Sequence, residues 1–155
     1  MAARLKLIMV AILALVGLDQ FVKALAVVYI GPAGRIPVIP GFFDLVLWHN
    51  TGAAFGFLSR IPGGRWILIG LTVVALGVAV WVMLTHGGRS RAMLWCLSLI
   101  CGGAVGNLID RVRTGQVIDY LLVYYKDWYW PAFNVADSAI SIGGVWLALL
   151  VLRGK

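Results

Sequence analysis

The chain has 155 residues, of which 62% are hydrophobic and only 12% are charged, and its formal net charge is +7. Soluble domains carry about a quarter charged residues, so this composition argues against a soluble protein and indicates an all-α membrane protein. The basic residues stand at the ends of apolar runs and form no cluster, which argues against a nucleic-acid-binding surface.

The first apolar run covers residues 7–30 and contains Asp19 and Lys23. At about 20 residues per crossing, this length predicts a membrane-spanning helix. A secretory signal peptide is the alternative, with residues 24–26 as its cleavage site. The run resumes after the two charged residues, which favours the span.

Residues 31–65 are rich in proline and glycine, which interrupt helices, and short strands such as 42–48 are expected between them. Residues 112–132 are expected to form a second outer loop with many aromatic side chains, as at a membrane interface. The apolar runs outside these segments predict one domain, 1–155, with four spanning helices at about 7–30, 66–85, 92–110 and 134–152.

Charge predicts the orientation of these spans. With four of them, both chain ends and the 86–91 loop share one side, which carries basic residues and no acid. Positively charged segments remain in the cytoplasm, so both termini are expected there. All six acidic residues are aspartates elsewhere in the chain.

Several polar residues lie inside these apolar runs, where a charge is costly. Asp19 and Lys23 are spaced i, i+4 and are expected to form an ion pair, which either is purely structural or holds other polar groups in place. Asn107, Asp110 and Arg111 share one helical face, and Arg111 is expected to neutralise Asp110.

Small residues precede that polar face. Gly102 and Gly106 form a GxxxG pattern, which predicts close packing of this helix against a neighbour.

Cys96 and Cys101 are five positions apart, a poor spacing for a disulfide or a metal site, and are expected to be buried as small apolar residues. Neither a metal nor a cofactor is expected.

Asp119 and Asp137 have no basic partner close in sequence. If the fold brings them together, like-charge repulsion makes the pair share one proton, which supplies a base and an acid for hydrolysis. Asn134 stands where it can cap the last span and bond this pair. Ion or proton transport through intramembrane carboxylates and a purely structural adaptor are the alternatives.

Five ordered segments resemble the motif blocks of bacterial lipoprotein signal peptidase, also called signal peptidase II. They are D-Q-x-x-K at 19–23, N-T-G-A-A-F-G at 50–56, G-G-A-x-G-N-x-x-D-R at 102–111, V-x-D-Y at 117–120 and F-N-x-A-D-S at 133–138. Tyr120 departs from the family pattern, which more often has phenylalanine there.

The resemblance implies four transmembrane helices, a small extracytoplasmic β-sheet and a short surface helix. It also implies an aspartyl endopeptidase of the bacterial inner membrane. The charge pattern of the spans predicts an active site towards the outer face, and a monomer is expected. Its substrates would be prolipoproteins, cut just before a diacylglyceryl-modified cysteine, and the cyclic peptide globomycin would inhibit it. The implied catalytic pair is Asp119 and Asp137. The implied substrate-binding and supporting residues are Asp19, Lys23, Asn50, Gly52, Asn107, Asp110, Arg111 and Asn134.

Overall fold

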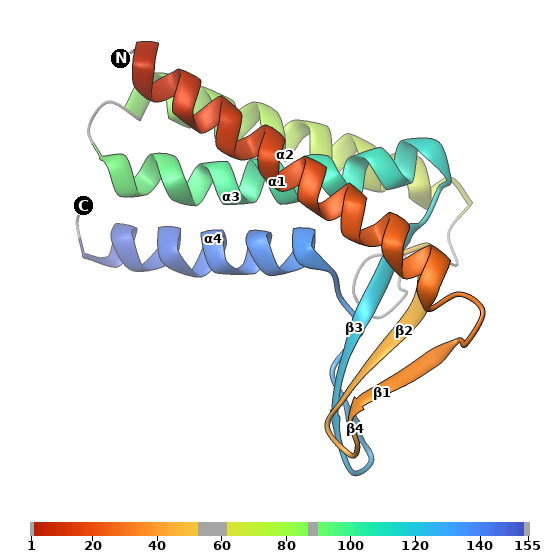
Figure 1. The fold of residues 1–155 in the computed structure, drawn as a ribbon. Helices are drawn as coiled ribbons and strands as arrows, with labels where there is room; N and C mark the ends of the chain where they lie inside the picture. Colours follow the sequence, from red (N-terminus) through yellow and green to blue (C-terminus); the bar gives the residue numbers. More distant parts are fainter. Residues whose placement is uncertain (1, 53–61, 87–89, 154–155) are drawn as a thin grey trace.

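The computed structural model describes residues 2–52, 62–86 and 90–153, and contains four long helices: α1 (Ala2–Tyr29), α2 (Gly64–His86), α3 (Arg91–Arg113) and α4 (Val135–Leu152). Each helix has an apolar stretch long enough to cross a membrane, which confirms the four predicted spans. In Figure 1 the helices form one bundle, with a small sheet projecting from one end. The start of α1, the end of α2, the start of α3 and the end of α4 lie at the opposite end.

The central helix of the bundle is α3. Half of its most apolar window is buried, against 11–17% for the other three helices, because α1, α2 and α4 all pack against it. The outer faces of those three helices carry exposed large apolar side chains. A helix that is apolar on its exposed face is suited to a lipid environment.

Glycines allow this close packing. A Cβ atom on Gly106 would lie 2.6 Å from the Asp19 carboxylate of α1, and one on Gly103 would lie 2.4 Å from the Ala136 carbonyl oxygen of α4. A Cβ on Gly102 would likewise meet a leucine side chain of α1 at 2.6 Å. The predicted GxxxG contact is therefore confirmed, with α1 as the partner.

The sheet has four strands in the order β1-β2-β3-β4, and neighbouring strands run antiparallel. β1 (Arg35–Ile39) and β2 (Phe43–Asn50) come from the proline- and glycine-rich segment, as predicted. β3 (Val117–Tyr125) and β4 (Trp128–Tyr129) come from residues 112–132.

The prediction of a loop over residues 112–132 is wrong, because β3 is a long inner strand. Apart from Asp119, it consists of β-branched, aromatic and leucine residues, and it is bounded by Gly115 and by a turn in which Lys126 has φ 53°. Such residues favour extended backbone, and pairing with β2 satisfies the peptide groups of β3.

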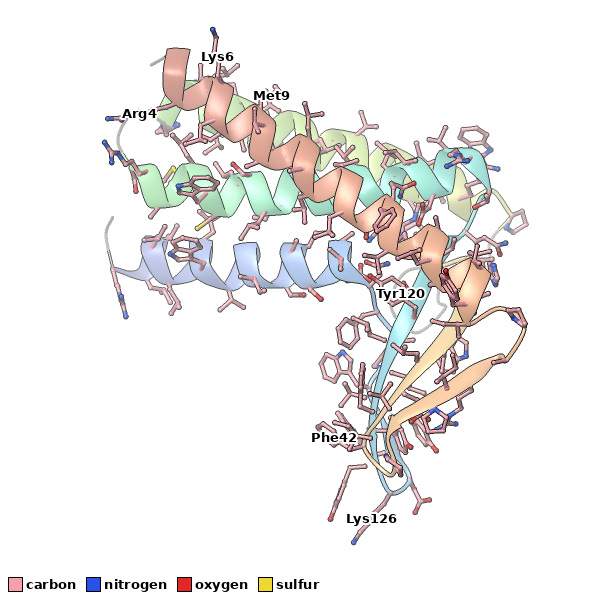
Figure 2. All side chains as sticks on the ribbon, viewed as in Figure 1. Arg4, Lys6, Met9, Phe42, Tyr120 and Lys126 are labelled. Carbon is pink, nitrogen blue, oxygen red and sulfur yellow. The ribbon has the colours of Figure 1, made fainter. Side chains whose placement is uncertain are left out.

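The junction of bundle and sheet is apolar. Ala26 of α1 and Ile30, which directly follows that helix, pack with Tyr120 of β3, and Figure 2 labels Tyr120 where the sheet meets the helices. Cys96 and Cys101 are buried and unbonded in α3, as predicted. The expected short surface helix is absent from the described part of residues 31–65, while residues 53–61 lie outside the described chain.

Candidate active site

The first turn of α4 organises the site. Asn134 is its N-cap: the Asn134 side-chain oxygen accepts a bond from the Asp137 backbone N–H at 2.9 Å, and the Asp137 carboxylate accepts one from the Asn134 N–H at 3.2 Å. This reciprocal arrangement is a capping box. It confirms the predicted cap and fixes the Asp137 carboxylate at the start of the helix.

Two amides hold Asp119, which is buried on β3. The side-chain nitrogen of Asn134 donates to one carboxylate oxygen at 2.8 Å, and that of Asn50 on β2 donates to the other at 3.0 Å. The Asn50 oxygen accepts a bond from the Gly52 N–H at 3.0 Å, which orients the Asn50 amide. Pairing of β2 with β3 brings these residues together.

Asn107 of α3 links this group to a buried ion cluster. Its nitrogen donates to the Asp137 carboxylate at 2.7 Å. Its oxygen accepts from Lys23 at 2.9 Å and from Asn134 at 3.2 Å. The amide is therefore fixed in one orientation, with its N–H group towards Asp137.

Lys23 lies at the centre of the ion cluster and is only 2% exposed. Its ammonium group contacts Asp19 at 2.8 Å, Asp110 at 2.7 Å and the Asn107 oxygen, which uses all three of its donors. The predicted Asp19–Lys23 pair is confirmed. The predicted neutralisation of Asp110 by Arg111 is wrong, because Asp110 faces α1 whereas Arg111 lines a cavity.

Gln20, which stands in the D-Q-x-x-K motif but was given no role from the sequence, is a member of this cluster. Its side-chain nitrogen donates to Asp110 at 2.9 Å and to the Gly106 carbonyl at 3.2 Å, which joins α1 to α3. Asp19 joins α1 to α4 in turn, since its carboxylate accepts from the Ala136 N–H at 3.0 Å. A neutral amide inside an apolar span was the available signal for Gln20.

A cavity of about 1170 Å³ opens in front of this network. Five of the predicted residues line it: Asn50, Gly52, Arg111, Asp119 and Asp137. The other five form the buried network behind it: Asp19, Lys23, Asn107, Asp110 and Asn134. Much of the remaining lining is apolar or aromatic, and includes Leu47, Trp48, Trp130, Phe133 and Ile142.

The electrostatic environment favours a proton at this site. Burial raises the pKa of Asp119 to about 7, and the nearby charge of Asp137 acts in the same direction. Hydrogen bonds from Asn50 and Asn134 oppose this rise. Among the described residues, no ion pair reaches Asp119 or Asp137, and no group of His, Cys and acidic side chains is suited to a metal ion.

Four spans and two buried carboxylates that face one cavity define an integral membrane protein with a polar site at one end of its helix bundle. The family model described as Signal peptidase (SPase) II matches residues 11–153. The chain therefore belongs to the signal peptidase II family and is a peptidase.

Individual relatives agree with this assignment. The lipoprotein signal peptidase of Cupriavidus necator is 46% identical over 142 residues, which cover 91% of this chain and 80% of the relative. That of Symbiobacterium thermophilum is 42% identical over 136 residues, or 88% of this chain and 87% of the relative. A bacterial membrane enzyme solved by the in meso method at 1.9 Å resolution superimposes with a TM-score of 0.85 at 28% identity, covering 97% of this chain and 95% of that one.

Proposed function

We propose that this protein is an aspartyl endopeptidase that removes signal peptides from prolipoproteins, with Asp119 and Asp137 as its catalytic pair. Its relatives are lipoprotein signal peptidases. The observation that carries the mechanism is that one residue holds both carboxylates: the Asn134 side-chain nitrogen donates to Asp119, the Asn134 backbone N–H donates to Asp137, and both carboxylates face one cavity. Lys23, the buried cation nearby, is instead occupied by Asp19 and Asp110.

The pair supplies a base and an acid. Two carboxylates on one cavity repel as like charges, so they hold one proton between them near neutral pH. The ionised carboxylate takes a proton from water as the water oxygen attacks the scissile carbonyl carbon. The protonated carboxyl group polarises the carbonyl oxygen, and a proton then passes to the leaving nitrogen as the C–N bond breaks.

The cavity suits a lipid-bearing substrate. We propose that cleavage falls just before a diacylglyceryl-modified cysteine, with the signal helix and acyl chains against the apolar walls. Arg111 lines the same cavity and is able to bind a carbonyl or ester oxygen with its guanidinium group. Globomycin is expected to compete for this cavity.

We place the protein in the bacterial inner membrane, with both termini in the cytoplasm and the site towards the outer face. This orientation is supported by basic residues at those ends of the spans that share one side with the two termini, namely Arg4, Lys6, Arg91 and Arg153. The sheet and site lie at the other end of the bundle. One chain supplies every residue of the proposed site, which is consistent with a monomer.

The test is cleavage of a lipidated precursor by the purified protein. Asp119→Asn and Asp137→Asn are each expected to lower the rate at least about 1000-fold, because the pair loses its acid–base capacity. Asp127→Asn is the matched control, since Asp127 is exposed in the turn between β3 and β4. Thermal unfolding in detergent shows whether each variant is folded. A folded Asp119 or Asp137 variant that cleaves at the wild-type rate would remove that residue from the mechanism.

A further inference from the structure

A second cavity lies at the end of the bundle away from the sheet, between the first turns of α1 and α3. Its volume is about 350 Å³, within the lower range of small-ligand sites. Its lining consists of Arg4, Leu7, Ile8, Arg91, Leu94 and Trp95. We propose that this cavity binds the phosphate headgroup of an anionic phospholipid in the leaflet that holds the chain ends.

The two guanidinium groups provide the charge. Arg4 and Arg91 are the first residues of two spanning segments, so they reach the same depth at one membrane surface. Figure 2 labels Arg4 at that end of the bundle. Neither α1 nor α3 has an acidic residue in its first turn, and no ion pair within residues 2–52, 62–86 and 90–153 involves either arginine.

The start of α3 adds to this positive potential. Helix N-termini carry unpaired N–H groups and attract anions. The Ser90 side chain accepts a bond from the Met93 N–H at 3.3 Å. This cap does not bond the N–H groups of the first two helical residues, which precede Met93. The helix end therefore supplements two arginines that already face one cavity.

The cavity walls favour a lipid over free phosphate. Leu7, Ile8 and Leu94 supply apolar surface beside the charges, which suits the glycerol and upper acyl carbons of a lipid. Trp95 completes the rim, and tryptophan is enriched at membrane interfaces. Basic pockets between spanning helices are typical sites for anionic headgroups.

The experiment measures phosphatidylglycerol binding to the detergent-solubilised protein by native mass spectrometry. The double variant Arg4→Gln/Arg91→Gln is expected to bind about tenfold more weakly, since each basic group near an anionic lipid contributes several-fold. The matched control, Lys6→Gln/Arg153→Gln, removes the same charge from residues that do not line the cavity, and is expected to stay within about twofold of wild type. If the double variant does not fold, each arginine is changed singly, with a loss of at least about twofold expected.

Three outcomes would overturn the proposal. Equal weakening in both double variants would mean general attraction to the basic end of the bundle. Equal binding of phosphatidylcholine would mean that the negative charge of the headgroup is not recognised. Full competition by inorganic phosphate at the lipid concentration would mean that free phosphate is the ligand. Because the measurement involves no cleavage, its result is independent of the proposed peptidase mechanism.

Discussion

Asn134 bonds Asp119 through its side-chain nitrogen and the Asp137 carboxylate through its backbone N–H, and its side-chain oxygen caps α4. These tasks need different parts of the amide. The oxygen caps the helix, whereas the nitrogen donates to Asp119 and Asn107. A substitution that keeps an acceptor but removes the donor therefore separates the folding role of Asn134 from its role in the site.

Asn134→Ser makes that separation, because serine also caps helices. We expect the free energy of unfolding to change by less than about 1 kcal/mol. Cleavage should slow about 100-fold, because Asp119 loses the hydrogen bond from the side-chain nitrogen of residue 134. Asn134→Ala loses both the cap and the bond to Asp119, and its free energy of unfolding should be about 1 kcal/mol lower than that of Asn134→Ser. Thermal unfolding and cleavage kinetics check both values. A serine variant with normal cleavage would limit Asn134 to capping.

The proposed role of Asp119 predicts a pH dependence of the cleavage rate. With the pKa of Asp119 near 7, cleavage should decline as the pH rises through about 7, because the pair loses its shared proton. In Asn50→Ala the decline should move to higher pH, since the bond from Asn50 lowers the Asp119 pKa. The measurement is kcat against pH. An unshifted decline in a folded variant would contradict the assignment of that limb to Asp119.

The raised pKa of Asp119 also makes the stability of the fold depend on pH. The folded-state pKa of Asp119 lies above the ordinary value of 3.8, so between about pH 4 and 7 the folded protein binds more protons at this group than the unfolded chain does. The contribution of Asp119 to the free energy of unfolding therefore falls as the pH rises across that window.

At the scale of elements, the contact between α3 and α4 depends on Gly103. A methyl group there would lie 2.4 Å from a backbone carbonyl of α4, which cannot rotate away as a side chain can. Gly103→Ala should therefore push α4 outward and displace Asp137 together with its cap. We expect a loss of about 1–3 kcal/mol in stability, seen by thermal unfolding, and slower cleavage.

Gly144→Ala is the control for that variant. Gly144 lies on α4, but a methyl group on it would meet nothing within 4 Å. Alanine is the better helix former, so this change should be neutral or slightly stabilising. Equal destabilisation by both substitutions would show that helix propensity, and not the α3–α4 contact, determines the result.

The elements differ in how far sequence predicts them. Apolar length predicts the spans, and the i, i+4 spacing predicts the Asp19–Lys23 pair, because both are local properties. The contact between Lys23 and Asp110 joins residues far apart in sequence and depends on how α1 packs on α3. β3 could have been predicted from its run of strand-forming residues, but aromatic residues near a membrane also indicate an interfacial loop.

At the scale of the whole molecule, the buried interior of the bundle is apolar in the half away from the sheet and polar next to the sheet. Ile8, Met83 and Leu97 belong to the apolar core, and α1 contributes to that core through residues near its start. The buried charges and amides gather where the helices meet the sheet. The proposed orientation sets the apolar core towards the cytoplasmic leaflet and the polar network towards the outer one.

Labelling tests this orientation. A cysteine introduced at Lys126, exposed in the turn between β3 and β4, should react with a membrane-impermeant maleimide in intact spheroplasts. One introduced at Arg91 should react only after the membrane is opened. The native cysteines should add little background, since both are buried. The reverse pattern would invert the topology.

The walls of the large cavity have a consequence for substrate range. Apolar contact is non-directional, so side chains such as Leu47, Phe133 and Ile142 distinguish a substrate by bulk and length and not by the order of its residues. The polar side chains of the lining, which include His49, Arg111 and Ser138, are able to select for hydrogen-bonding groups near the carboxylates. If the proposed function holds, the apolar part of the cavity accepts precursors that differ in residue order but share a similar bulk.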